Sequence, residues 1–107
     1  KWNIQINLLD NKAVDDSIKK EVLSMSLGRK GEVQDLGQIM YDNTKNFSED
    51  LLVWSADNGF FDQRLRRIAS SRFFSEHGRY EKSDEELAEA IAQEKERFIE
   101  RIRTRKE

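Results

Sequence analysis

Residues 83–107 read SDEELAEAIAQEKERFIERIRTRKE, and this stretch decides the fold class. Ser83 and Glu86 have the spacing of a capping box, in which each side chain accepts a hydrogen bond from the backbone N–H of the other residue. Acidic side chains fill the first turn and basic side chains the last, as the dipole of a helix favours. The stretch predicts a long amphipathic helix in a mainly α-helical protein.

Apolar side chains of this helix recur at spacings of three and four residues, which is typical of a coiled-coil seam. The seam residues are Ala88, Ile91, Phe98 and Ile102, with Lys95 as the one charged member. We expect this seam to hold a homodimer or a higher oligomer together. Because the seam is short, packing against the body of the same domain is the alternative.

The chain has 107 residues, about the length of one domain, and 37% of them are charged. Helices suit this composition, because one stripe of a helix can be buried while its other faces stay in water. Four more helices are indicated by apolar spacing. The first of these helices ends at Gly28, and the second contains Gly37. The third follows an N-cap at Ser48 and breaks at residues 57–59, and the fourth ends at Gly78. A glycine inside a helix costs about 1 kcal/mol relative to alanine, so we expect close packing where the second helix contains one.

The first nine residues, KWNIQINLL, alternate apolar and polar side chains. This period of two predicts a half-buried β-strand. A lone strand leaves backbone donors and acceptors unpaired, so we expect it to pair with the same strand of a second protomer. The expected fold is mainly α, with one N-terminal strand followed by four or five helices. Residues 1–46 would form a strand-helix-helix part and residues 47–107 a helical part.

A strand, a helix, a glycine-containing turn and a second helix, in this order, resemble the ribbon-helix-helix family of DNA-binding proteins over residues 1–45. The resemblance implies a two-stranded ribbon that enters the major groove of DNA. The outward side chains that would read the bases are Asn3, Gln5 and Asn7. Amide side chains suit adenine, because they donate and accept hydrogen bonds together.

The same resemblance implies phosphate contacts at the amino end of the second helix. The residues expected to make these contacts are Lys1, Arg29, Lys30 and Gly31. Residues 1–45 carry equal numbers of basic and acidic side chains, whereas residues 60–82 carry six basic and three acidic ones. The positive charge that favours binding to DNA is therefore concentrated further along the chain.

A second candidate surface for nucleic acid lies in residues 60–79, where basic and aromatic side chains interleave. Its basic patch consists of Arg64, Arg66, Arg67 and Arg72. Such side chains bind nucleic acid through phosphate contacts and stacking. The alternative is a solvated face whose arginines pair with acidic residues of the same chain.

Composition also excludes several classes of protein. Without cysteine, the chain has no disulfide framework and no cysteine-based zinc site. No apolar run approaches the ~18 residues needed to cross a membrane, and no segment resembles a signal peptide. We therefore expect a cytoplasmic protein without membrane contact.

Catalysis is not expected, since His77 is the only histidine and no glycine-rich phosphate loop is present. We expect neither a metal nor a cofactor. The predicted function is that of a small non-enzymatic DNA-binding regulator of transcription or accessory protein, as found on mobile elements, acting as an oligomer on double-stranded DNA. The alternative is a protein–protein interaction module, an adaptor or inhibitor, that does not bind nucleic acid. An exposed cluster of Trp54, Phe60, Phe73 and Phe74 would be the signature of that alternative.

Overall fold

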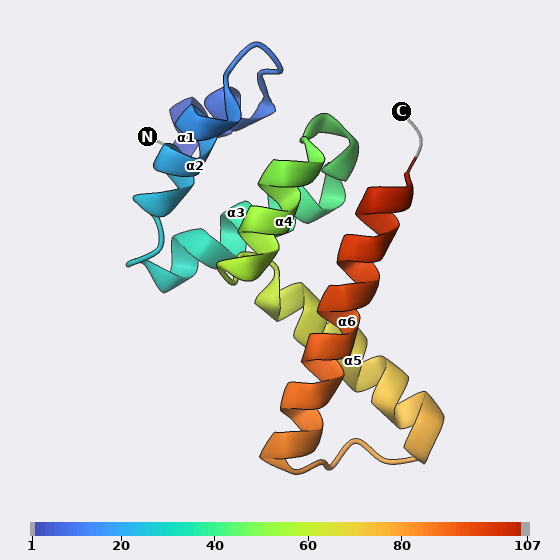
Figure 1. The fold of residues 1–107 in the computed structure, drawn as a ribbon. Helices are drawn as coiled ribbons and strands as arrows, with labels where there is room; N and C mark the ends of the chain where they lie inside the picture. The colour runs from blue at the N-terminus through green and yellow to red at the C-terminus, as the bar shows by residue number, and fades with distance from the viewer. Residues whose placement is uncertain (1, 106–107) are drawn as a thin grey trace.

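The computed structural model describes residues 2–105, and the side chains of residues 6–105. In this range the chain forms α-helices and one 3-10 turn, without any strand (Figure 1). The elements in chain order are α1 (Trp2–Asp10), α2 (Asp16–Ser24), α3 (Lys30–Asp42), η1 (Thr44–Asn46), α4 (Glu49–Asp57), α5 (Asp62–His77) and α6 (Asp84–Thr104).

The predicted N-terminal β-strand is wrong, because residues 2–10 form helix α1. A helix satisfies its backbone hydrogen bonds within its own segment, so α1 needs no partner strand from a second protomer. Among the α1 residues whose side chains are described, residues 6–10, the most deeply buried is Leu9. This residue falls outside the period-two pattern, whose last apolar member is Leu8. The expected fold of one strand and four or five helices is therefore replaced by an all-helical fold.

The predicted ends of the later helices are confirmed. Ser83 Oγ accepts from the Glu86 backbone N–H at 3.1 Å, and Glu86 Oε1 accepts from the Ser83 backbone N–H at 2.9 Å, so the capping box at the start of α6 is complete. Ser48 caps α4 by accepting from the Leu51 backbone N–H at 3.1 Å. Gly78 ends α5 in the left-handed region, with φ of 71°.

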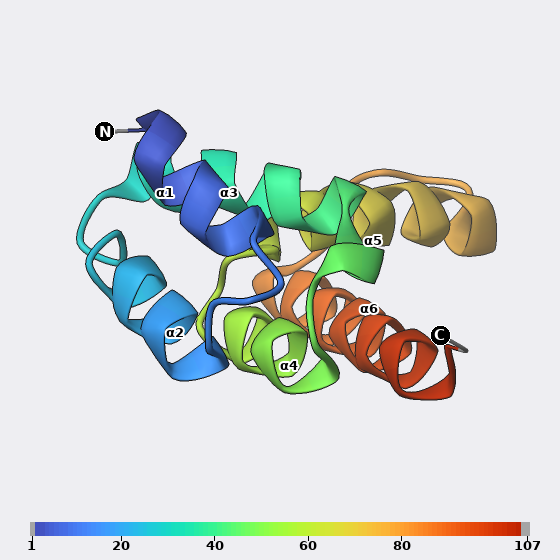
Figure 2. The same ribbon diagram turned by 90° about the horizontal axis from the view of Figure 1, so that it is seen from above.

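One hydrophobic core joins all six helices. Leu9 of α1, Leu23 of α2 and Leu36 of α3 pack in the same cluster as Leu52 of α4, Leu65 of α5 and Phe98 of α6. Helix α6 lies along both α5 and α4, and α2 lies beside α4 (Figure 2). Both predicted parts of the chain, residues 1–46 and 47–107, contribute to this core.

The apolar seam of α6 is largely used inside the chain. Phe98 and Ile102 are buried in the core, and Ile91 packs against it. Ala88 is the exposed member of the seam. Phe98, Ile102 and Ile91 therefore pack on the body of the same domain, which was the alternative to an oligomer seam.

Helix α3 makes a close backbone contact with the turn that joins α4 to α5. A Cβ atom added to Gly37 would lie 1.6 Å from the carbonyl oxygen of Phe60. The turn itself contains Gly59 at a φ of 84°, which is a conformation that other residues rarely adopt. These two glycines position the first turn of α5 against α3.

Candidate nucleic-acid interface

The predicted base-reading residues do not belong to a ribbon in this structure. Lys1 and the side chains of Asn3 and Gln5 lie outside the described residues, while Asn7 is exposed on α1. Membership of the ribbon-helix-helix family remains a prediction. The two-stranded ribbon that it implies has no counterpart between residues 2 and 105.

The predicted phosphate-contacting residues Arg29, Lys30 and Gly31 lie at the start of α3 and are exposed. Arg29 forms an ion pair with Glu32 at 3.0 Å, one turn along the chain. Lys30 forms no ion pair within the described part of the chain. It is therefore the cation of this group that remains available to a ligand.

Two of the four arginines of the basic patch bind acidic residues of neighbouring helices. Arg64 forms an ion pair with Asp42 of α3 at 3.1 Å, and its guanidinium lies 4.7 Å from the centre of the Tyr41 ring. Arg72 pairs with Glu94 of α6 at 2.5 Å, and Glu94 is only 5% exposed. These two arginines attach α5 to its neighbouring helices.

Arg66 and Arg67 have a different environment. Both are exposed, and neither has an ion-pair partner among the described residues. Residues three and four apart share a face of a helix, so these arginines share a face with Gln63 one turn earlier and Ser70 one turn later. We call Gln63, Arg66, Arg67 and Ser70 the α5 stripe. It is an uninterrupted polar, cationic surface about two turns long.

An exposed aromatic pair extends the same face of α5. The Phe74 side chain, one turn beyond Ser70, is 42% exposed, and its ring stacks on Tyr80 with centres 4.4 Å apart. The stripe therefore continues from cationic side chains to a flat aromatic surface. Sequence spacing did not identify this pair, because Tyr80 lies in the loop beyond the end of α5.

The α5 stripe borders a surface cavity of about 720 Å³ that also includes the start of α3. Lys30 of α3 and Arg66 of α5 both line this cavity, together with the amide side chains of Gln34, Asn58 and Gln63. One carboxylate, that of Asp62, belongs to the same lining. The fold thus brings one residue of the predicted phosphate-contacting group beside the predicted basic patch.

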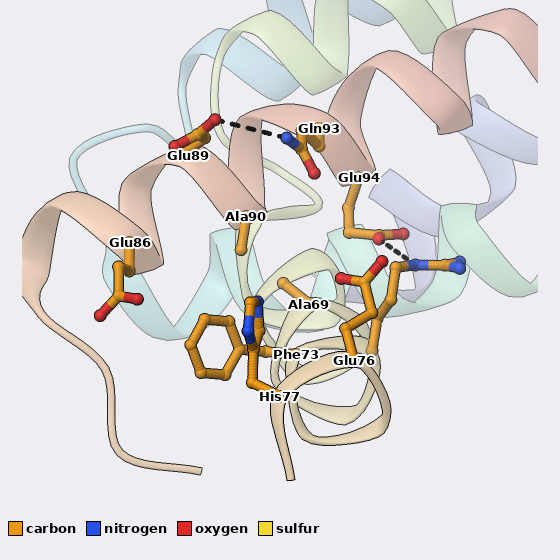
Figure 3. Close-up of a pocket in the computed structure, with 10 residues that line it drawn as sticks. Ala69, Phe73, Glu76, His77, Glu86, Glu89, Ala90, Gln93 and Glu94 are labelled. Atoms are coloured by element: carbon orange, nitrogen blue, oxygen red, sulfur yellow. Dashed lines mark hydrogen bonds and ion pairs between the residues drawn. The ribbon is translucent and has the colours of Figure 1, made fainter. Parts of the chain in front are cut away.

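The opposite side of α5 faces α6 across an acidic cleft (Figure 3). The cleft has a volume of about 500 Å³, and its carboxylates are those of Glu76, Glu86, Glu89 and Glu94. The His77 ring packs on Phe73, with ring centres 4.2 Å apart. No group of three or more histidine and acidic side chains in the described structure is arranged to hold a metal ion.

Glu94 is the most enclosed carboxylate of the acidic cleft. It accepts from Arg72 at 2.5 Å and from Arg97 at 3.2 Å, so two guanidinium groups compensate its charge. A buried charge with such partners is a structural ion pair.

No family model matches this chain, and no curated protein or solved structure is significantly similar to it. Over residues 2–105, no helix has the length and apolar character that crossing a membrane requires. The arrangement of the residues is therefore the only guide to function.

Proposed function

We propose that this protein binds double-stranded DNA through the α5 stripe, as a small non-enzymatic regulator or accessory protein. The observation that carries this proposal is the pair Arg66 and Arg67. Both are exposed and unpaired within the described residues, whereas Arg64 and Arg72 of the same helix are engaged with carboxylates. The positive charge of residues 60–82 is thus partly available to a ligand.

The chemistry of the stripe suits the major groove of DNA. A guanidinium group binds phosphate oxygens or the edge of guanine with two parallel hydrogen bonds, and glutamine does the same with adenine. A serine hydroxyl can donate to or accept from either base. The α5 stripe combines these three side-chain types on one face, where the arginines and Gln63 are exposed and Ser70 is half-buried.

The connection between α4 and α5 also supports the proposal. Residues 58–61 form a short turn that contains Gly59 at positive φ. Helix-turn-helix proteins join two helices by a short, often glycine-containing turn and place the second helix in the major groove. In this comparison α5 would be the helix in the groove, and Lys30 at the start of α3 would contact a flanking phosphate.

The proposal is tested by titrating a labelled DNA duplex with the protein at several salt concentrations. We expect the double variant Arg66→Ala/Arg67→Ala to bind at least about tenfold more weakly, because each arginine that contacts DNA contributes about 1–3 kcal/mol. The dependence of log affinity on log salt should become shallower by roughly one for each lost phosphate contact.

Arg103→Ala is the matched control for this titration. Arg103 is an exposed arginine of α6 that lies 3.8 Å from a Glu49 carboxylate oxygen, outside the α5 stripe. We expect its removal to leave both the affinity and the salt dependence unchanged. Equal affinities of the double variant and the unmodified protein would remove the α5 stripe as the DNA-binding surface.

The alternative, a protein–protein interaction module, has one observation in its favour. Ile18, Met25 and Leu27, on α2 and the turn after it, are large apolar side chains between 41% and 63% exposed. The aromatic cluster expected for this alternative does not form at the surface, because Phe60 and Phe73 are buried. Self-association stays a prediction. Light scattering with and without DNA separates a DNA-dependent complex from a DNA-independent one.

A further inference from the structure

A second cationic site lies away from α5, where α2 approaches the start of α4 (Figure 2). The residues before and within the first turn of α2, the segment that ends at Ser48, and Arg105 surround a cavity of about 660 Å³. Four cationic side chains line it, against the single carboxylate of Asp16. These cations are Lys12, Lys19, Lys45 and Arg105. A cavity with this excess of positive charge is suited to an anion.

Lys19 is the residue that makes this cavity unusual. Its side chain is only 3% exposed, yet it forms no ion pair with any residue of the described structure. Its side chain makes a cation–π contact, with Nζ 5.7 Å from the centre of the Phe47 ring. Enclosing so much of a lysine side chain without an ion-pair partner is costly. Its ammonium group is not among the fully buried atoms that lack a hydrogen bond, so it opens into the cavity. Lys19 also lies near the N-terminus of α2, where the helix dipole disfavours a cation.

The remaining polar groups of the cavity do not neutralise Lys19. The Asp16 carboxylate accepts a hydrogen bond from the Ser48 hydroxyl, so it is held against the start of α4. Arg105 donates to the carbonyl oxygen of Thr44 at 2.6 Å and also to that of Phe47. These bonds hold Arg105 in the wall of the cavity.

We propose that this cavity binds a phosphate group, either as the free ion or on a small phosphorylated molecule, with Lys19 as its innermost ligand. Each lysine ammonium has three donors, and lysine binds phosphate as a point charge that places few demands on geometry. Lys12 and Lys45 are exposed and would contact the outer oxygens. A small ligand is favoured over the backbone of DNA, because the Lys19 side chain is almost entirely enclosed.

The test is a titration with inorganic phosphate at constant ionic strength, maintained with chloride, followed by the backbone amide signals of the protein. We expect saturable shifts confined to residues 12–19, residues 44–48 and Arg105, together with a rise of Tm that grows with phosphate concentration. Phosphate shifts that do not saturate, or that chloride reproduces, would overturn the proposal.

Lys19→Met keeps the length and apolar packing of the side chain while removing its charge. We expect it to weaken phosphate binding at least about tenfold, whereas Lys20→Met, next to it on α2 and outside the cavity lining, should bind as the unmodified protein does. Lys45→Gln at the exposed mouth is a second variant that does not disturb the core, and it should weaken binding severalfold. Unchanged affinity in both cavity variants would contradict the assignment.

A DNA titration of Lys19→Met tests whether the cavity binds a small phosphate ligand or the phosphate backbone of DNA. We expect its affinity for a duplex to be unchanged, because the cavity and the α5 stripe lie on different elements. A loss of DNA affinity, without any binding of inorganic phosphate, would overturn the small-ligand site. Since the two sites have separate variants, failure of one proposal leaves the other intact.

Discussion

Lys19 and Glu94 are the two charged residues that are buried within the described structure, and their surroundings differ. Glu94 has two arginine partners, Arg72 at 2.5 Å and Arg97 at 3.2 Å. Lys19 has no ion-pair partner among the described residues, and its Nζ lies 5.7 Å from the centre of the Phe47 ring. Because a buried charge needs compensation, the arginine partners account for Glu94, and the proposed phosphate would compensate Lys19.

At the same scale, Glu86 links the stability of α6 to pH. The backbone N–H of Ser83 and then the Arg79 guanidinium donate to its carboxylate, which holds the pKa of Glu86 below its ordinary value of 4.5. Since the folded pKa is depressed, the stabilisation is complete above that ordinary value. It is lost as the pH falls through the lower pKa of the folded protein.

We therefore expect Glu86→Gln to lose less stability than the unmodified protein as the pH falls below 4.5. Glutamine keeps an acceptor for the capping box but has no proton to take up. Denaturant unfolding at each pH measures the difference. Glu85→Gln, at an exposed position in the same turn, is the control and should follow the unmodified protein. Identical pH dependence of Glu86→Gln and the unmodified protein would contradict this linkage.

At the scale of elements, α5 has one structural face and one free face. Leu65, Ala69 and Phe73 are buried. Arg64 and Arg72 extend this attachment with ion pairs to α3 and α6. The α5 stripe lies outside this attached face, and its two arginines form no ion pair with another described helix. This division is what makes α5, rather than α1, the element proposed to bind DNA.

The position of α5 depends on the contact between Gly37 of α3 and the turn before α5. We expect Gly37→Ala to destabilise the protein by about 3 kcal/mol or more, because the added methyl group meets the Phe60 carbonyl, which belongs to the backbone and cannot rotate away. Denaturant unfolding gives the free energy.

Gly31→Ala is the matched control, since it lies in the same helix and a Cβ there meets nothing within 4 Å. Alanine is the better helix former, so this variant should be more stable by about 0.5–1 kcal/mol. If both variants shifted stability in the same direction, the close approach of α3 to the turn would be refuted.

At the scale of the whole molecule, a single core connects residues as distant in sequence as Leu9 and Ile102. The first helix thus belongs to the same folding unit as the last. This arrangement replaces the expected pairing of an N-terminal strand across a dimer. Phe98 and Ile102 of α6, which were expected to bind a second protomer, belong to the core within one chain.

Because α1 packs on this core, we expect Leu9→Ala to lower the free energy of unfolding by about 2–5 kcal/mol. The substitution truncates a side chain that is only 2% exposed. Leu27→Ala, at a position 41% exposed, should change stability by less than about 0.5 kcal/mol. Thermal or denaturant unfolding measures both. A small loss for Leu9→Ala would indicate that α1 does not stabilise the remainder of the molecule.

Interactions between neighbouring residues could be predicted from the sequence. The capping box of Ser83 and Glu86, the N-cap Ser48 and the helix end at Gly78 are all found where their residue types indicate. Each of these helix ends depends on hydrogen bonds between residues three or four apart along the chain, so the local sequence is enough to predict its position. The candidate surface was found in part for the same reason, since a cluster of arginines is visible in the sequence.

The sequence by itself determined that most of this protein is helical, where its last helix begins, and which segment concentrates positive charge. Only the tertiary structure decided that residues 2–10 are helical and which arginines are free. The partners Asp42 and Glu94 approach α5 from other helices, Glu94 being 22 residues from Arg72 along the chain. Likewise, Leu9 is buried only because α2, α4 and the other helices supply a core. Contacts of this kind depend on how helices pack, and no local pattern of residues contains that information.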